Sequence, residues 1–231
     1  MTLPYLGTLV KGLAGLAPKD LPAGQDGGVL EIDEPLRTER LLLRPFTEDD
    51  LDDVTAYHSL PDVVRYLYWE VRDRDQVREL LGQRRRRRRL AEEGDIATLA
   101  VVLQETGRVI GEVNLHWVSA MHRQGEFGFV FHPDFHGHGY ASEASTRLLD
   151  LAFDSLGLHR VYGRADASNV ASAALMRRLG MRQEAHFVQN EIFKGDWGDE
   201  VVFAILADEW RARRTDRPDH GSGRSNQSTS Q

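Results

Sequence analysis

The sequence contains no cysteine, and this absence excludes several kinds of chemistry. A chain without thiols forms no disulfide, offers no thiolate nucleophile and cannot ligate a metal through sulfur. The lack of cysteine also fits the reducing conditions of the cytosol. We therefore expect a cytoplasmic protein.

Long hydrophobic runs and an excess of positive charge are also missing. No segment approaches the roughly 20 apolar residues that a membrane-spanning helix requires, so we expect no membrane association. Residues 1–17 are moderately apolar, but they lack a basic start and contain Pro4 and Lys11, which argues against a signal peptide. The net charge of −7 argues against nonspecific nucleic-acid binding by the whole surface.

The chain has 231 residues, of which 41% are hydrophobic, enough to bury the core of one sizeable domain. Prolines and glycines between residues 18 and 28 indicate a linker, so residues 1–35 are predicted to form an N-terminal extension and linker. Residues 36–212 are predicted to form one domain. The polar segment 213–231 is typical of a disordered tail.

Hydrophobic periodicity predicts strands and helices mixed along the domain. The predicted strands are 40–46, 97–104, 109–117, 126–131 and 160–165, followed by a hairpin of 185–193 and 200–206. The predicted helices are one starting after Thr47, then 75–93, 146–153 and 170–179. Antiparallel hairpins combined with a crossover helix favour an α/β fold of the mixed α+β kind over a doubly wound sheet.

The segment 132–144 reads HPDFHGHGYASEA and joins a predicted strand to a predicted helix. Gly137 and Gly139 can adopt positive φ and let the backbone approach a ligand closely. The first N–H groups of the helix have no partner within the helix, and the helix dipole favours negative charge there. The segment therefore predicts a cradle for phosphate oxygens.

Three other segments give this loop a context. They are Thr38–Pro45 (TERLLLRP), Asn169–Met181 and Glu191–Asp199 (EIFKGDWGD). In this order, the four segments resemble the GNAT superfamily of acyl-CoA-dependent N-acyltransferases. They are similar to the branch that contains the bacterial ribosomal-protein N-terminal acetyltransferases. The resemblance covers residues 36–212 and implies a mixed, mostly antiparallel sheet, splayed at its centre and flanked by helices.

The resemblance also implies a site for acetyl-CoA between the strands 125–131 and 160–165. The pyrophosphate would sit on backbone N–H groups of the glycine loop, and the pantetheine arm would lie along the preceding strand. Asn169 would bind the pantetheine, and Ser172 would lie near the sulfur. Arg177 and Arg178 are placed for the 3′-phosphate, with a simple position on the helix surface as the alternative. The usual loop has Gln or Arg where this chain has Asp134. The implied loop and strand residues are Phe129, Val130, Phe131, His136, Gly137, His138, Gly139, Tyr140 and Ala141.

Asn169 and Ser172 also have a simpler interpretation, because both residue types are favoured at helix starts. If Ser172 lies near the thioester, its hydroxyl would donate a hydrogen bond to the departing thiolate. The amine would attack the thioester directly, since the chain has no cysteine for a thiol-bound intermediate. Backbone N–H groups near Phe131 would hold the oxyanion.

The resemblance implies that Glu191 is the general base, although by itself it would be interpreted as an exposed strand glutamate. Glu126 ranks second because it lies in the central strand, and Glu112 is a further rival. A solvated glutamate, with a pKa of about 4.3, is a poor base for an amine. Burial would have to raise the pKa of the residue that acts, and for Glu191 we expect Phe187 and Phe193 to provide it.

The histidines do not predict a metal site. His136 and His138 flank Gly137 in a loop, and no cysteine or acidic partner completes zinc-like spacing. We expect no metal.

Residues Arg84 to Arg89 form a run of six arginines. In a helix they would point in all directions, which is typical of a solvated helix. The alternative is electrostatic contact with an acidic protein, RNA or the ribosome, or recruitment of an anionic substrate.

The sequence leaves the acceptor open among protein N-termini, aminoglycosides, polyamines and other small amines. The donor could be succinyl-CoA instead of acetyl-CoA. A function of another class is a non-catalytic CoA-binding or ribosome-associated module that uses the arginine run. A homodimer is implied by the resemblance alone.

Overall fold

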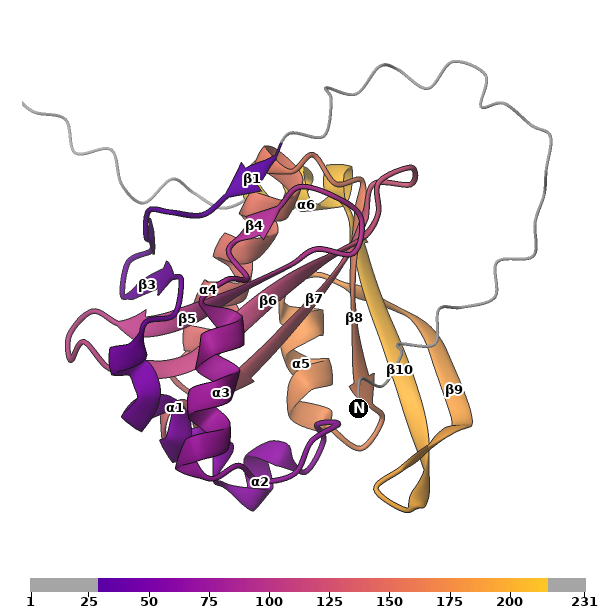
Figure 1. The fold of residues 1–231 in the computed structure, drawn as a ribbon. Helices are drawn as coiled ribbons and strands as arrows, with labels where there is room; N and C mark the ends of the chain where they lie inside the picture. The colour runs from indigo at the N-terminus through magenta and orange to yellow at the C-terminus, as the bar shows by residue number, and fades with distance from the viewer. Residues whose placement is uncertain (1–28, 216–231) are drawn as a thin grey trace, which may run out of the picture.

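An eight-stranded sheet forms the centre of residues 29–215, the part of the chain that the computed structural model describes (Figure 1). The strand order is β2-β3-β5-β6-β7-β8-β10-β9. Only β7 and β8 run parallel, and all other neighbours are antiparallel. The predicted mixed, mostly antiparallel sheet is therefore confirmed. The strands are β2 (Leu36–Arg37), β3 (Leu41–Arg44), β5 (Ile96–Leu103), β6 (Val109–Ser119), β7 (Gln124–Phe131), β8 (Arg160–Asp166), β9 (Arg182–Phe193) and β10 (Asp196–Leu206).

Helices cover both faces of the sheet. One face carries η1 (Glu48–Asp50), α1 (Leu51–His58), α2 (Pro61–Val64) and α3 (Arg74–Arg84). The other carries α4 (Tyr140–Asp150) with its π-helical extension η3 (Leu151–Ser155), α5 (Val170–Arg178) and α6 (Ala207–Thr215). Because strand side chains alternate, β5 serves both layers: Leu99 and Val101 pack toward α4, whereas Ala100 and Val102 pack toward α1 and α3.

Helix α3 begins where the sequence supplies a capping box. Asp73 accepts hydrogen bonds from the N–H groups of Asp75 and Gln76, and the Gln76 side chain accepts one from the Asp73 N–H. This pairing satisfies amide groups that the helix itself leaves free.

The predicted helix over 75–93 is wrong in its C-terminal half. α3 ends at Arg84, and the chain then turns into β4 (Arg89–Leu90). The Thr98 N–H donates to the Arg87 carbonyl at 2.7 Å, and Arg84 itself is buried in an ion pair with Glu112. These tertiary contacts override the helix propensity of arginine.

Residues assigned by sequence to the extension join the domain. β1 (Leu30–Glu31) pairs with β4, and Ile32 is buried after it. At the other end, α6 includes Arg213 and Arg214, where the predicted tail begins. Residues 1–28 and 216–231, with most of the predicted extension and tail, lie outside the described residues. Within residues 29–215, no helix has the length and apolar character needed to cross a membrane.

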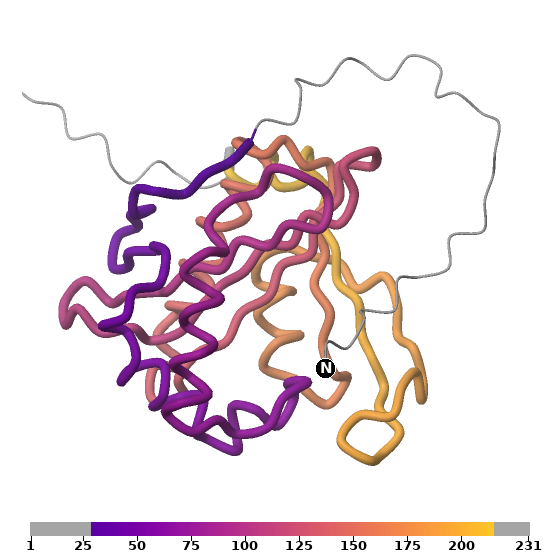
Figure 2. The backbone as a smooth tube through the Cα atoms, viewed as in Figure 1, coloured from indigo at the N-terminus to yellow at the C-terminus, as the bar shows by residue number. Residues whose placement is uncertain are grey.

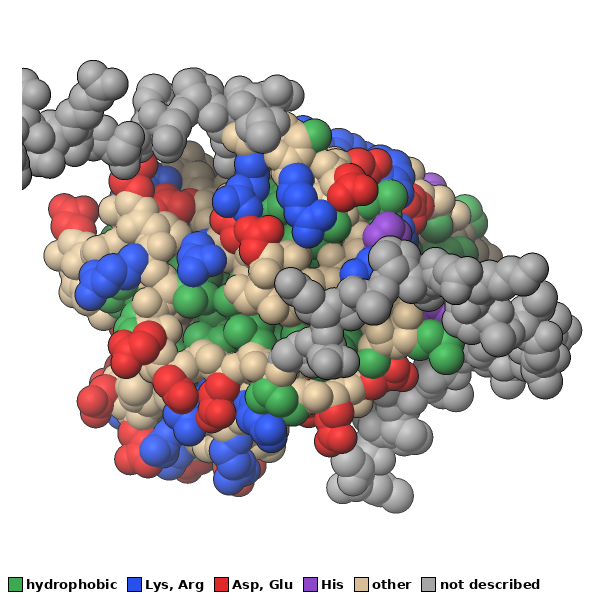
Figure 3. All heavy atoms as spheres, turned by 90° about the horizontal axis from the view of Figure 1, so that it is seen from above, with side chains coloured by type: hydrophobic (Ala, Val, Ile, Leu, Met, Phe, Trp, Pro, Cys, Tyr) green, Lys and Arg blue, Asp and Glu red, His purple; other side chains and the backbone are tan. Residues whose placement is uncertain are grey.

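The surface mixes charges of both signs. On the face seen from above, basic and acidic side chains are interspersed, with hydrophobic side chains between them (Figure 3). Many of these charges form ion pairs, such as Arg160 with Glu184 and Arg182 with Glu209. A mixed surface fits the modest net charge of −7.

The sheet opens between β7 and β8. Only three residue pairs join them: Gln124 with Arg160, Gly125 with Val161, and Glu126 with Tyr162. Beyond these pairs the two strands separate toward their carboxyl ends, as the backbone trace shows (Figure 2). The loops that follow both strands therefore emerge at the mouth of this opening. The predicted splay between strands 125–131 and 160–165 is therefore confirmed.

Candidate active site

The glycine loop between β7 and α4 has the conformation that its sequence predicts. Gly137 and Gly139 have φ of 79° and 82°, values that favour glycine. Gly139 is the N-cap of α4, and the Glu143 N–H is the first in the helix to find a partner, the Gly139 carbonyl at 3.0 Å. Within the described chain, the N–H groups from Gly137 to Ser142 donate to no protein acceptor.

The run of free N–H groups begins one residue later than the sequence predicts. The His136 N–H donates to the Pro133 carbonyl at 2.9 Å, so it is already satisfied. The amides available to an anion start at Gly137 and continue into the first turn of α4, where the helix dipole adds positive potential.

An electrostatic clamp holds the loop from the side. Arg40 donates to the His138 carbonyl at 3.0 Å and stacks over the Tyr140 ring at 4.6 Å. Glu143 accepts hydrogen bonds from the Thr38 hydroxyl at 2.6 Å and from the Arg40 N–H and Nε, each at 2.8 Å. Partial burial opposes ionisation of Glu143, but these hydrogen bonds outweigh it and lower its pKa. The TERLLLRP segment thus fixes the start of α4.

The histidines of the loop are engaged within it. His136 Nε2 lies 3.3 Å from the Phe131 carbonyl oxygen, and His138 Nδ1 lies 2.8 Å from the His136 carbonyl oxygen. The His138 ring also stacks on Tyr140 at 5.6 Å. Throughout residues 29–215, no group of three or more His, Asp or Glu side chains is arranged to hold a metal ion.

The edge of β7 that faces the opening is free for a strand-like ligand. The His132 N–H donates to Ile110 on β6 at 2.9 Å. Because hydrogen-bonded pairs alternate along an antiparallel ladder, Val130 bonds to β6, and the polar backbone groups of Phe129 and Phe131 point toward β8. The side chains divide between the two faces of the sheet: Val130 packs toward α1 and α3, and Phe131 packs toward α4.

Asn169 and Ser172 start α5 on the opposite side of the opening. The Asn169 side-chain oxygen accepts a hydrogen bond from the Ser172 N–H at 3.1 Å, so the capping role is confirmed. The Ser172 hydroxyl is half-buried and forms no hydrogen bond with the described residues. It is therefore free to interact with a ligand in the opening.

Arg177 does not point toward the glycine loop. Its guanidinium donates to Gln183 at 3.2 Å and lies over the Phe203 ring at 5.0 Å, which directs it toward β9 and β10. The neighbouring Arg178 instead places Nε 3.5 Å from the Ser142 hydroxyl in the first turn of α4. Arg178 is thus the better placed of the two for a phosphate held by the loop.

Glu126 belongs to the last residue pair before the strands separate, opposite Tyr162. Burial raises the pKa of Glu126, with Arg164 and a hydrogen bond to Tyr162 opposing the shift. Burial and the nearby Glu126 in turn raise the pKa of Tyr162 to about 12. Beside them, Arg164 Nε donates to buried Glu200 at 3.0 Å.

Glu191 lies near the tip of the β9–β10 hairpin. The Tyr68 hydroxyl donates to its carboxylate at 2.5 Å, and the Tyr68 ring meets Phe193 edge-on at 5.4 Å. Phe187, expected to help bury Glu191, is 46% exposed and does not. The Lys194 ammonium donates to the carbonyls of Val64 at 3.1 Å and Trp69 at 3.2 Å.

These contacts dock the hairpin against the segment that follows α2, at the lower end of the molecule in Figure 1. Burial, together with the hydrogen bond to Glu191, raises the pKa of Tyr68. Arg164 and Glu200 act electrostatically on both Tyr68 and Glu126. The two candidate bases therefore border one charged region.

Glu112 is removed from the list of bases. It is 1% exposed, pairs with Arg84 and accepts a hydrogen bond from the Tyr57 hydroxyl at 3.2 Å. It lies beneath α1 and α3, away from any opening, and its role is structural.

Sequence reasoning missed several residues of this site. Tyr68 is 123 positions from Glu191, and no local pattern connects them. Arg40 and Glu143 both fall in segments that carried the resemblance, but their pairing across 103 positions needs the folded chain. Tyr162 and Arg164 alternate with Val161 and Gly163 on β8, and this period-2 pattern could have placed them on the face of Glu126.

Comparison with known proteins matches this chain to one family. Residues 40–182 match the family model described as acetyltransferase (GNAT) domain. YnaD of Bacillus subtilis (strain 168), an uncharacterized N-acetyltransferase, is 30% identical, covering 76% of this chain and 98% of YnaD. Spermidine N(1)-acetyltransferase of Vibrio cholerae is 25% identical, covering 75% of this chain and 97% of the relative.

A solved structure agrees. The GNAT-family acetyltransferase from Bacillus anthracis superimposes with a TM-score of 0.69 at 29% identity, covering 76% of this chain and 100% of that one.

Proposed function

Because the chain belongs to the GNAT acetyltransferase family, we propose that it moves the acetyl group of acetyl-CoA to a primary amine by direct attack. The observation that carries the proposal is the opening between β7 and β8. It joins free loop amides, an unpaired strand edge, the Ser172 hydroxyl and the half-buried Glu126 at one end of the sheet.

The residues fit an acyl-CoA cosubstrate. The N–H groups from Gly137 to Ser142 would bind the pyrophosphate, and Arg178 would add a positive charge beside them. The backbone of Phe129 and Phe131 would pair with the pantetheine arm, assisted by the amide of Asn169. Acetyl-CoA supplies the activated acyl group, and the Phe131 N–H would stabilise negative charge on the carbonyl oxygen.

Glu126 is our first choice for the group that takes the proton from the amine. It sits where the strands separate, and burial moves its pKa in the direction that a base requires. Glu191 ranks second, which reverses the order expected from sequence, because its carboxylate is already occupied by the Tyr68 hydroxyl. Glu191 and Tyr68 would instead bind the ammonium group of the acceptor.

Ser172 would assist departure of the thiolate with a hydrogen bond. A thiol has a pKa of about 8.5, so the leaving group needs little protonation near neutral pH. A hydroxyl without a protein partner suits this modest task.

The acceptor is proposed to be a cationic amine, with polyamines tested first. Glu126 and Glu191 face the acceptor side without a basic partner that fully neutralises them, whereas Glu200 is paired with Arg164. Carboxylates at a binding site favour positively charged ligands. The spermidine acetyltransferase relative supports the same order of testing.

The test measures CoA release from acetyl-CoA and from succinyl-CoA with spermidine, an N-terminal peptide and an aminoglycoside as acceptors. Glu126→Gln should lower kcat by roughly 100-fold or more, and Glu191→Gln should mainly raise the KM of the amine. Glu184→Gln serves as the control. Glu184 lies on β9 outside the opening, where it pairs with Arg160 and Arg182.

The opposite pattern, with kcat lost in Glu191→Gln and retained in Glu126→Gln, would make Glu191 the base. CoA binding without turnover on any acceptor would favour the non-catalytic module instead.

A further inference from the structure

A second hollow, distant from the opening between β7 and β8, lies at the edge of the sheet. It has a volume of about 750 Å³ and lies between the chain that follows β3 and the end of α3. Strands β5 and β6 separate β3 from β7, so this hollow is independent of the acyl-CoA site. Its lining consists of Pro45, Phe46, Thr47, Gly82, Arg85, Arg86 and Arg88.

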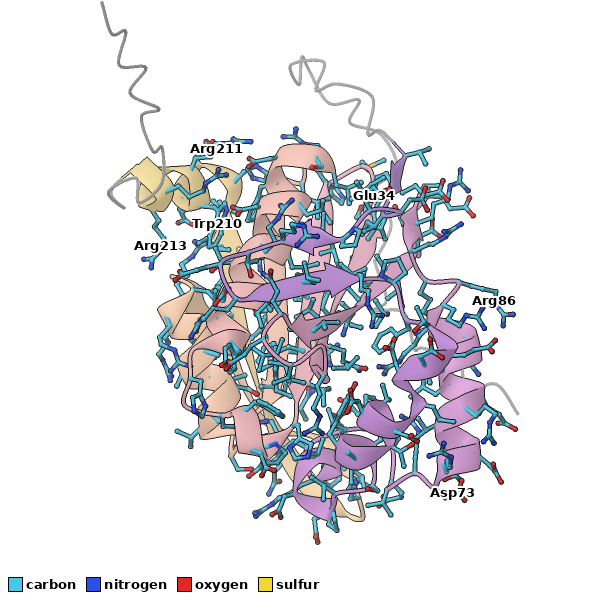
Figure 4. The ribbon with its side chains drawn as sticks, turned by 90° about the vertical axis from the view of Figure 1, so that its left-hand side faces the viewer. Glu34, Asp73, Arg86, Trp210, Arg211 and Arg213 are labelled. Atoms are coloured by element: carbon cyan, nitrogen blue, oxygen red, sulfur yellow. The ribbon has the colours of Figure 1, made fainter. Side chains whose placement is uncertain are left out.

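The lining contains three arginines and no carboxylate. Arg86 forms no ion pair in the described part of the chain, and Figure 4 shows it extending outward at the end of α3 opposite Asp73. Arg85 pairs with Glu48, whose side chain is 80% exposed. Arg88 pairs with Asp33 at 2.8 Å and with Glu31 at 3.6 Å, both of which are exposed. Exposed pairs are worth roughly 0–1 kcal/mol, so an anion can displace these carboxylates.

The backbone beneath these arginines is held in place. Arg84 is buried against Glu112. The Arg87 carbonyl accepts from the Thr98 N–H at 2.7 Å, and the Arg88 carbonyl accepts from the Ile32 N–H at 2.9 Å. The turn is thus fixed to β5 on one side and to the segment after β1 on the other. A fixed backbone reduces the ordering cost of binding.

We propose that this hollow binds a small anion that carries two or more phosphate groups. Guanidinium groups form bidentate hydrogen bonds to phosphate, and three arginines line this one concave surface. The volume lies in the range of small-molecule sites, roughly 300–1,000 Å³. The inference does not depend on the acceptor or on the catalytic residues proposed above.

Gly82 allows the hollow to be changed without removing an arginine. It lines the hollow from within α3, and a Cβ at this position would meet no atom within 4 Å. Glutamate and glutamine both form helices better than glycine. Gly82→Glu places a negative charge three and four residues before Arg85 and Arg86, and Gly82→Gln is its neutral control.

The experiment titrates the full chain with inorganic triphosphate and with ATP, in calorimetry, with saturating CoA present to fill the acyl-CoA site. We expect one binding site in wild type and in Gly82→Gln, and at least tenfold weaker binding in Gly82→Glu and in Arg86→Ala. Thermal unfolding of each variant verifies that it is folded, and the KM of acetyl-CoA should stay unchanged in all of them.

Three results would overturn the proposal. The first is no binding of triphosphate or ATP to wild type. The second is equal binding by the two Gly82 variants. The third is binding only of an RNA oligonucleotide or of a glutamate-rich peptide, which would identify the hollow as part of a macromolecular contact surface.

Discussion

The face of the sheet beneath α4 and α5 buries apolar side chains, whereas the face beneath α1 and α3 also buries charged ones. Leu148, Leu149 and Phe153 are all at most 1% exposed on the first face. The second contains buried Glu112, Arg84 and His58. Apolar packing is nondirectional, but a buried charge needs its partner. Glu126 and Tyr162, which we propose lie on the acceptor side, share the second face, so the proposed binding chemistry and the buried charge occur on the same face.

Removing one partner of the buried pair is the most severe test of this difference. Glu112→Ala leaves Arg84 buried without its counter-charge, and we expect the free energy of unfolding to fall by about 3–5 kcal/mol. The double variant Glu112→Leu with Arg84→Met should recover most of this loss, because an apolar pair needs no counter-charge. Urea unfolding measures both.

The matched control lies on the apolar face. Leu149→Ala should cost about 2–5 kcal/mol through the cavity that it creates. If Glu112→Ala cost less than this control and the double variant gave no recovery, the two faces would not differ in the way described.

A smaller difference between the two faces is expected in the pH dependence of the free energy of unfolding. Burial, together with Arg84 and Arg72, lowers the pKa of His58 from 6.5 to about 3. As the pH falls below 6.5, His58 binds a proton in the unfolded chain, whereas in the folded protein it stays neutral until about pH 3. Stability is therefore lost on acidification. Between pH 7.5 and 5.0 this group contributes a loss of about 2 kcal/mol.

Urea unfolding of wild type and His58→Gln across that range tests the assignment. The difference between their slopes isolates His58, because the carboxylates titrate equally in both. Parallel slopes would show that His58 has the same pKa in the folded protein as in the unfolded chain, which would contradict the assignment. Leu149→Ala, on the other face, should follow the wild-type slope.

The smallest effect is expected from the hydrogen bonds of Glu143 with Thr38 and Arg40, which lie at the edge of the apolar face. Glu143→Ala removes the acceptor for Thr38 and Arg40, and a loss of about 1 kcal/mol at a partly exposed site would raise the KM of acetyl-CoA roughly fivefold. Steady-state kinetics with Glu79→Ala, an exposed position on α3, as control would detect it. An unchanged KM would mean that the loop keeps its shape without the clamp.

Local signals in the sequence were sufficient to predict the conformation of the glycine loop. Gly137 and Gly139 lie between a strand pattern and a helix pattern, and their positive φ values follow. The capping role of Asn169 was equally local. Such features depend on a few neighbouring residues, which is why periodicity and residue type predict them.

Local signals could not predict where α3 ends or which residue is the partner of Glu191. Six arginines are compatible with a continuing helix, and only the burial of Arg84 against Glu112, 28 positions further along (112 − 84), together with the pairing of β1 with β4, explains the turn. The sequence could not separate Arg177 from Arg178 as a phosphate contact, because helix position alone does not show which side chain a neighbouring strand attracts.

The docking of the β9–β10 hairpin also has a consequence for how the protein is made. Tyr68 and Glu191 are separated by 123 positions, and Lys194 and Val64 by 130. Closing loops of this length is costly in entropy and slow. The proposed acceptor side can therefore be completed only after residue 194 has left the ribosome, so a partly synthesised chain that already holds the glycine loop still lacks the wall proposed to bind the amine.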